Sequence, residues 1–441
     1  MESKGYSEAI SMFSRMFAYP LFDKKLMEKE INAVNSENEK NLNDDSWRQN
    51  EILKVLSDEK HPYHHFSTGN TQTLKALGLD ALHQKLLEYY DKFYIPTSMK
   101  LAVLSNASLD ELQQLITTNF SDIRRNKNNL PSVYGKIDTT IPPYSSDNLG
   151  KVVWIEKKSL PETLDFIFLF DEILSKYETK PVDYISYIFK YAGEGSLLTN
   201  LKSKKFATNI STGVVTNTKH FTQFTISLTL TKLGVENVTK VIQIAQDYIK
   251  KVRDQPISEE IYNEIANISH IQFNFVEKNN EPGDYLSTMA GNMFDYPPKY
   301  LIEGDYLHSK YDQEMLASFV NKLTIENSLI FIGTDKYPKK EIIELYFLNA
   351  TYKNEHWYGT KYLEKKITPE LMTILKANSE ELNFKMRPKN AYITQKSELI
   401  KCSKDDVTNN VCSKEMVAPI PVNSVNVENL KVWYKVSINH K

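Results

Sequence analysis

Two glutamates near the start of the chain are spaced so that they could act on one ligand. Glu30 and Glu37 lie in the segment EKEINAVNSENEKN. Seven residues make two turns of an α-helix, so both side chains lie on one face of a predicted helix. Carboxylates arranged in this way can bind a metal ion or orient a histidine ligand. A solvated acidic helix face has the same pattern, so the spacing alone leaves both interpretations open.

Three histidines follow in the segment HPYHHF, at His61, His64 and His65. Histidines so close together suggest a zinc site. However, Pro62 interrupts the segment, no helical pattern is present, and neither H-x-x-E-H nor H-E-x-x-H occurs in the sequence. We therefore favour a loop of ordinary imidazoles. Three further histidines are isolated in the sequence and are predicted to be structural: His270, His308 and His356.

A glycine-flanked segment and the segment that follows it suggest a peptide site. Gly193–Leu198 (GEGSLL) begins a predicted helix with Ser196 as its N-cap, and such a start can hold a carboxylate or a peptide terminus. A plain turn has the same pattern. Ala207–Thr216 is β-prone and polar on one side, so at a sheet edge it could accept an extended peptide or be a normal edge strand. The sequence contains no G-x-S-x-G, Walker A, G-x-G-x-x-G or C-x-x-C motif.

Hydrophobic periodicity predicts the elements that position these residues. Helices are expected at 6–17, 26–56 (one long or two abutting), 82–93, 108–120, 181–191, 196–204, 235–252, 258–275, 285–294 and 312–322. Strands are expected at 98–106, 151–156, 163–170, 207–216, 223–231 and 328–334. Ser108 and Glu111 form a predicted capping box at the start of the fourth helix.

A weak internal repeat suggests two related domains. Phe93–Ser108 parallels Lys322–Tyr337, and both place a polar turn before a short apolar run. We predict an α+β fold of two homologous domains, each a mostly antiparallel sheet covered by helices. The chain begins in a helix without a first strand, so we expect the first domain to be incomplete. The predicted units are 1–130 (first domain), 131–150 (linker), 151–385 (second domain) and 386–441 (connector tail).

Composition excludes several protein classes. The 54 Lys and Arg residues nearly balance the 56 Asp and Glu residues, and a net charge of -2 gives no support for nucleic-acid binding. No apolar run is long enough to predict a membrane span. Cys402 and Cys412 are the two cysteines, so a disulfide framework is not expected and a reducing compartment is favoured. With no signal peptide visible, we expect a cytoplasmic location.

Six segments together resemble the insulin-degrading enzyme (insulinase, pitrilysin-type) family of zinc peptidases. They occur in the family's order, within a resemblance that runs from about residue 6 to 440. The segments are Pro20–Lys25, Glu30–Asn41, Trp47–Arg48, His61–Leu74, Gly193–Phe206 and His356–Tyr362.

The resemblance implies a fold, a cofactor and site residues. Family members have four related α+β domains around a closed chamber, in which zinc (Zn2+) and a glutamate of an H-x-x-E-H helix activate water for peptide hydrolysis. Glu37 matches the distal zinc-ligating glutamate, and Glu30 matches a supporting carboxylate. The family's exosite, which captures a peptide N-terminus and pairs with it as a strand, implies these substrate-binding residues: Gly193, Gly195, Ser196, Leu197, Ile210, Thr212 and Gly213.

The sequence departs from the family at its catalytic motif. The H-x-x-E-H helix should lie further upstream than the 36 residues before Glu37 allow. We therefore expect no catalytic residue within this chain, the general base to lie upstream, and no tight zinc binding by the chain alone. Tyr191 and Ala192 replace a His-Glu pair found in many relatives, so capture of a peptide N-terminus is expected to be weakened.

Three hypotheses follow. The first is part of an insulinase-like zinc metalloendopeptidase that cleaves peptides in a chamber, inactive alone and completed by the second half of the peptidase or another subunit. The second is a non-catalytic relative that binds peptides or a partner. The third is a subunit that contributes Glu37 to a site completed by another chain.

Overall fold

The computed structural model describes residues 5–124, 127, 129–134, 136, 140–276, 281–377, 382–393, 420–421 and 433–434. The part before the sheet contains only helices and loops among its described residues. Its helices are α1 (Tyr6–Ala18), α2 (Lys24–Asn41), α3 (Asp45–Val55), α4 (Thr71–Lys75), α5 (Leu79–Phe93) and α6 (Leu109–Phe120).

The rest of the described chain forms a sheet with helices. Its strands are β1 (Lys151–Glu156), β2 (Thr163–Asp171), β3 (Ala207–Asn217), β4 (Phe221–Leu230), β5 (Ser328–Thr334), β6 (Lys353–Asn354) and β7 (Lys361–Lys366), with a separate pair β8 (Ile420–Pro421) and β9 (Trp433–Tyr434). Its helices are α7 (Pro181–Phe189), α8 (Leu197–Ser203), α9 (Lys232–Glu236), α10 (Val238–Asp254), α11 (Glu259–Asn274), α12 (Pro282–Asp295), α13 (Gln313–Asn321), α14 (Lys340–Tyr346) and α15 (Pro369–Lys376).

The seven-stranded sheet has the order β3-β4-β2-β5-β1-β7-β6. The β1–β5 pair is parallel and the other neighbouring pairs are antiparallel. All seven residues of β5 are buried, as expected for a strand covered on both faces. Strand β3 lies at one edge, so it has one hydrogen-bonded neighbour within the sheet.

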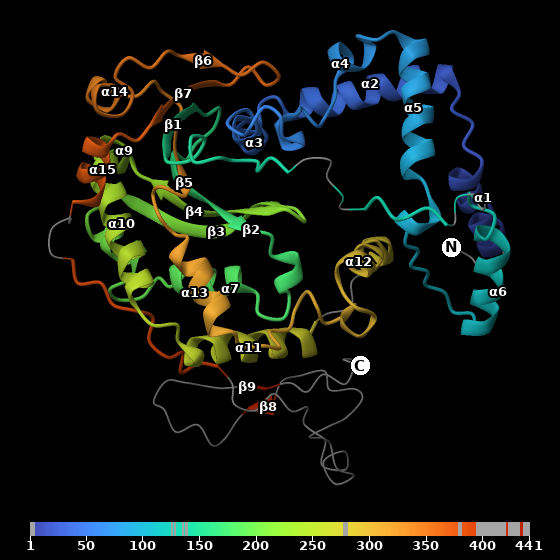
Figure 1. Ribbon diagram of the computed structural model, residues 1–441. Coiled ribbons are helices and arrows are strands. Elements are labelled where there is room, and N and C mark those ends of the chain that lie inside the picture. The colour runs from blue at the N-terminus through green and yellow to red at the C-terminus, as the bar shows by residue number, and fades with distance from the viewer. Residues whose placement is uncertain are drawn as a thin grey trace.

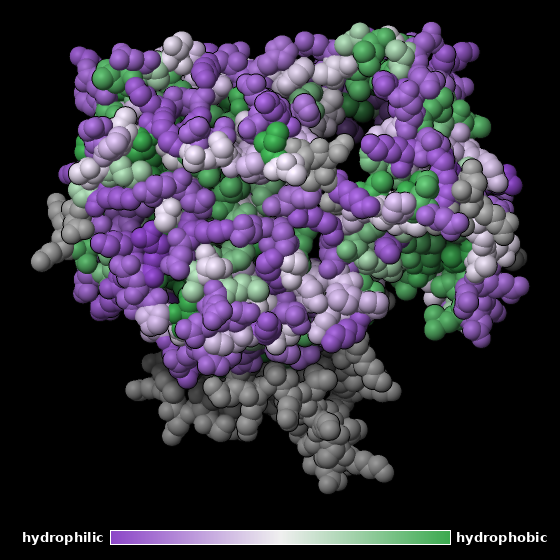
Figure 2. Space-filling model, in the orientation of Figure 1, coloured by the Kyte–Doolittle hydropathy of each residue, from purple (hydrophilic) through white to green (hydrophobic). Residues whose placement is uncertain are grey.

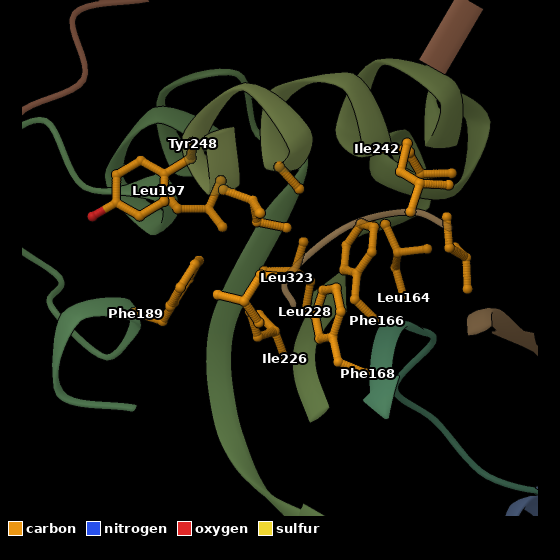
Figure 3. Close-up of a cluster of buried hydrophobic side chains, with 14 of the residues drawn as sticks. Leu164, Phe166, Phe168, Phe189, Leu197, Ile226, Leu228, Ile242, Tyr248 and Leu323 are labelled. Carbon is orange, nitrogen blue, oxygen red and sulfur yellow. The ribbon is translucent and has the colours of Figure 1, made fainter. Parts of the chain in front are cut away.

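Alternating side chains divide the strands between two cores. Phe166 and Phe168 of β2 belong to the larger core with α7, α8, α10 and α13, and Figure 3 shows them beside Leu164, Ile226 and Leu228. Ile167, between them, faces the other side, where α3 packs on the sheet. Figure 1 shows α2 leading away from α3 toward α4 and α5. Helices α1 and α6 stand beside the part of the chain that holds the sheet, from Lys151 to Lys376, which we call the sheet unit. The helices before it, α1 to α6, form the N-terminal unit.

The α+β prediction is confirmed, and most predicted elements form. Of the two alternatives expected at 26–56, one long helix or two abutting ones, two helices form, because Asp44 caps the start of α3 by accepting from the backbone N–H groups of Ser46 and Trp47. The capping box predicted at the start of α6 is present, with Ser108 and Glu111 bonding reciprocally. No helix among the described residues is long and apolar enough to span a membrane.

The strand predicted at 98–106 is wrong. Residues 99–105 lie in neither a helix nor a strand. A strand is stabilised by pairing, and every described strand begins at or after Lys151 and pairs elsewhere. The matching segment of the repeat, β5, is a strand because β1 and β2 flank it. The two repeat segments therefore differ in conformation.

The predicted domain boundaries at residues 130, 150 and 385 stay predictions. The described residues of 131–150 contain no helix or strand. The start of the predicted tail packs on the second unit, where the Asn390 N–H donates to Glu264. Cys402 and Cys412 lie outside the described residues.

Candidate functional site

Glu37 and Glu30 lie on α2 and both are exposed. Helix α2 begins at Lys24 because Asp23 accepts from two of its first backbone N–H groups. Ile31 and Asn38 are the buried residues of α2, and Glu37, next to Asn38 in the chain, points to solvent.

The described residues do not fit a zinc ion that this chain could hold alone. Among them, no group of three or more His, Cys, Asp or Glu side chains is placed to bind a metal. An exposed carboxylate such as Glu37 can act as one ligand, but a catalytic zinc needs three protein ligands and an open position. No chemical step is therefore assigned to zinc on this chain.

The three histidines of HPYHHF have separate roles. His61 is buried, and its Nδ1 accepts from the backbone N–H of Tyr63 over 3.0 Å. Burial lowers the pKa of His61, and the nearby His220 acts in the same direction. His64 is half-buried and His65 is exposed. Pro62–His64 form a short 3-10 helix, and the preference for ordinary imidazoles over a zinc site stays a prediction.

Strand β3 supplies an exposed edge 11 residues long. Ile210 points into the larger core, whereas Thr212 and Gly213 are half-buried. Val214 and Val215 are 42% and 39% exposed, a high value for apolar strand residues. An extended peptide could add to this edge through main-chain hydrogen bonds and cover the valines.

The glycine-flanked segment next to β3 is partly covered by the chain itself. Gly195, Ser196 and Leu197 are buried. Gly195 has φ +75°, and a Cβ there would lie 2.6 Å from the backbone N of Lys385, whose N–H donates to the Gly195 carbonyl over 3.0 Å. A ligand can therefore meet Gly195 only if the segment around Lys385 moves.

Gly193 is the more open end of the same segment. It is half-buried, and a Cβ there would meet the Tyr191 hydroxyl at 2.2 Å, so the Tyr191 ring lies against it. Ser196 caps α8 by accepting from the Thr199 N–H over 3.1 Å, which gives it a structural role. The accessible part of the candidate site is Gly193 with the outer edge of β3.

Sequence reasoning missed a buried charged cluster where α3 meets the sheet. We call it the α3 junction: Arg48, Glu51, Lys54, Glu355 and Tyr358. The Arg48 guanidinium donates to the carbonyls of Tyr358 (3.1 Å) and Glu156 (3.2 Å) while only 1% exposed. Lys54 Nζ lies 3.7 Å from the Glu51 carboxylate and also donates to Ser67. Trp47 and Arg48 carried part of the family resemblance, and that was the only signal in the sequence.

A second missed feature is a hydrogen-bonded chain from the HPYHHF loop to β3. The Tyr63 hydroxyl lies 3.2 Å from Thr216 Oγ1 and donates to Gln223 Oε1 over 3.0 Å. Gln223 donates to the Tyr144 hydroxyl over 2.8 Å, and Tyr144 donates to the Leu53 carbonyl over 2.6 Å. The loop therefore fixes one end of the candidate edge strand.

Comparison with known proteins matches this architecture. The profile described as the peptidase M16 inactive domain matches residues 81–269, and that of the middle or third domain of peptidase M16 matches residues 273–440. The human insulin-degrading enzyme is 28% identical over 433 residues, which are 97% of this chain and 40% of that protein. The Saccharomyces cerevisiae A-factor-processing enzyme is 32% identical over 359 residues, 80% of this chain and 33% of that protein.

Solved structures agree on the fold. The crystal structure of pitrilysin has a TM-score of 0.80 at 22% identity, over 99% of this chain and 43% of that one. The first half of the periplasmic protease PqqL from Escherichia coli has a TM-score of 0.56 at 11% identity, over 85% of this chain and 75% of that one. The chain spans about 40% of the length of the human and bovine relatives it matches. The two M16 profiles together match most of the sequence, and the chain belongs to the peptidase M16 family of the insulinase and pitrilysin type.

Proposed function

We propose that this chain is a peptide-holding, non-catalytic part of an insulinase-like metallopeptidase. The observation that carries the proposal is the exposed outer edge of β3, where Val214 and Val215 are open to solvent. Gly193 is half-buried in the segment between α7 and α8. A peptide in extended conformation would pair with this edge, and its side chains would alternate between the two faces.

We assign the hydrolytic step to residues that this chain does not supply. The sequence has no H-x-x-E-H motif. Glu37 is the residue that this chain would contribute to a zinc site formed with other residues, and its exposure leaves it available for that role. Glu30, on the same helix, would support it. Cleavage inside a chamber belongs to the complete assembly.

An apolar surface on the N-terminal helices supports a partner segment. Phe13, Phe17, Leu101, Phe120 and Ile123 belong to the residues that line a cavity of about 230 Å³. Phe13 is 43% exposed, and Figure 2 shows apolar side chains gathered on the face of the N-terminal unit. Exposed apolar patches of this kind mark interaction sites. We expect the rest of a peptidase, on the same polypeptide or on another chain, to cover this surface.

A second candidate function is a peptide-binding or partner-binding protein without any catalytic role. The cover that Lys385 forms over Gly195 favours the partner-binding form of this candidate, because the contact leaves less of the predicted exosite turn open to a peptide. The intact mass and N-terminal sequence of the native protein distinguish the two. A longer polypeptide with H-x-x-E-H upstream supports the peptidase, and a native start at Met1 supports the second candidate.

Proline substitutions in β3 test the peptide-holding proposal. Backbone N–H groups of adjacent strand residues point to opposite sides, so one of Thr212 and Gly213 presents its N–H outward. Of Thr212→Pro and Gly213→Pro, one should weaken the binding of a fluorescein-labelled extended peptide at least about tenfold with little loss of stability. The other should break a bond to β4 and lower the melting temperature.

Gly213→Ala is the matched control, because a Cβ at this position meets nothing within 4 Å. It should bind the peptide as the wild type does in fluorescence anisotropy. Equal peptide binding by both proline variants and the wild type would refute pairing at this edge.

A further inference from the structure

A rigid turn projects from the sheet toward the helix that carries Glu37. It joins β6 to β7, and β7 pairs with β1 inside the sheet. The Glu355 carboxylate accepts from the backbone N–H groups of Trp357 (2.5 Å) and Tyr358 (2.7 Å), and the Glu355 N–H donates to Thr360 over 2.8 Å. Glu355 is buried and Gly359 has φ +61°, so the position of Trp357 is set by the sheet.

The HPYHHFSTGN loop and α4 contact this turn at three points. The Phe66 ring stacks on Trp357, with ring centroids 4.4 Å apart and an interplanar angle of 12°. Thr68 Oγ1 lies 3.2 Å from the Tyr358 hydroxyl. At the third point Gln72 Nε2 lies 3.3 Å from His356 Nε2. Stacked aromatic pairs contribute more than their buried area alone, so Phe66 and Trp357 form the centre of the contact.

Helix α2 is held in turn by this loop and α4. The Thr71 N–H donates to Asn35 Oδ1 of α2 over 2.9 Å. Gly69 has φ +80° and lies close to Val34, because a Cβ added at Gly69 would be 3.6 Å from Val34 Cγ1. Burial raises the pKa of Tyr358, and its hydrogen bond with Thr68 opposes this rise. The described contacts therefore run from the sheet through Trp357 and the loop to Val34 and Asn35, within one helical turn of Glu37.

We infer that Trp357, with Phe66, is a latch that fixes α2 and α4 on the sheet and sets where Glu37 lies. The latch is a positioning contact and touches neither Glu37 nor a ligand. It does not depend on the proposed function, because it concerns the placement of α2 in the chain itself. Only two residues of α2 are buried, and a polar helix of this length is marginal without tertiary contacts.

A contact between the N-terminal helices and α12 lies elsewhere. The Tyr134 ring stacks on Phe294 of α12 with centroids 3.9 Å apart, and Lys100 lies over the same ring. Lys100 and Tyr134 follow α5 in the chain, and Phe294 belongs to α12. This contact therefore joins the segments after α5, and not α2, to α12. Loss of the latch should free α2 and α4 while leaving α12 in place.

Hydrogen exchange measured by mass spectrometry on the full chain tests the latch. In Trp357→Ala the stack with Phe66 is absent, so local opening of α2 and α4 costs less free energy. The exchange rates of the α2 and α4 amides should therefore rise at least about tenfold, while those of β2 and β5 stay unchanged. Trp357→Phe should keep most of the protection. The matched control is Tyr352→Ala, an exposed aromatic of the same hairpin region that packs on Trp154 and Tyr337 and should leave α2 unchanged.

Two outcomes would overturn the inference. One is unchanged exchange in α2 of Trp357→Ala, and the other is an equal rise in β5, which would indicate general destabilisation. If Trp357→Ala does not fold, Phe66→Ala replaces it, since it removes the same stack from the loop side and leaves the β6–β7 turn unchanged. A rise confined to α2 and α4 is then expected, and no rise contradicts the latch.

Discussion

Replacing Arg48 by alanine should lower the free energy of unfolding by about 3–5 kcal/mol, because removal of one partner from a buried charged network leaves the others uncompensated. The side chain is 1% exposed and donates to two backbone carbonyls. It also lies 3.5 Å from the Glu156 carboxylate and 3.9 Å from Asp45. Alanine would leave the two backbone carbonyls without this donor and open a cavity between α3 and the sheet.

Urea denaturation followed by circular dichroism measures this effect. The control is Arg15→Ala on α1, an exposed arginine whose replacement should change the free energy of unfolding by less than about 0.5 kcal/mol. Arg48→Lys should also be destabilising, because an ammonium group cannot reach both carbonyls as the planar guanidinium does. A loss below about 1 kcal/mol for Arg48→Ala would show that the α3 junction does not fix α3 to the sheet.

Glu51 should make stability fall as the pH rises from about 4.5 to 7. Burial raises the pKa of Glu51 from 4.5 to about 7, while the nearby Lys54 opposes this rise and Glu355 adds to it. Within this range the folded chain keeps a proton on Glu51 that the unfolded chain has released. The stabilisation is therefore complete below pH 4.5 and is lost as the pH passes 7, a change of about 3 kcal/mol for a shift of this size.

Glu51→Gln tests the pH dependence because glutamine stays neutral throughout. The stability of the wild type relative to Glu51→Gln should decline between pH 4.5 and 7.5 by about 3 kcal/mol. Glu59→Gln, at an exposed position, should leave the pH profile of the wild type unchanged. Parallel profiles for wild type and Glu51→Gln in chemical denaturation would contradict a raised pKa at Glu51.

Local signals in the sequence predicted most of the helices and strands. The apolar run SLIFIGT gave β5, and the cap residue Ser108 gave the start of α6. Helix α15 was missed although Thr368 and Pro369 provide an N-cap followed by proline at the first helical position. Strand β7 was missed because its sequence KYLEKK has three lysines and little apolar alternation.

The predictions that failed depend on contacts between residues far apart in the sequence. The segment 98–106 has the composition of a strand, but pairing partners decide whether one forms, and no described strand pairs with it. The Arg48, Phe66 and Trp357 side chains meet only after α3 and the β6–β7 turn come together, so no spacing along the chain could reveal their contacts. For the candidate site, the family resemblance named Gly195 and Ser196, whereas the fold buries both and leaves the β3 edge open.

Incubation of the isolated 441-residue chain with an internally quenched peptide and added zinc tests the central proposal most directly. Anisotropy of the same peptide sequence, labelled with fluorescein, reports binding in parallel. We predict saturable peptide binding that depends on the outer edge of β3, with the peptide recovered intact. Zinc-dependent cleavage that survives further purification would contradict a non-catalytic role, and absence of binding would contradict the peptide-holding role.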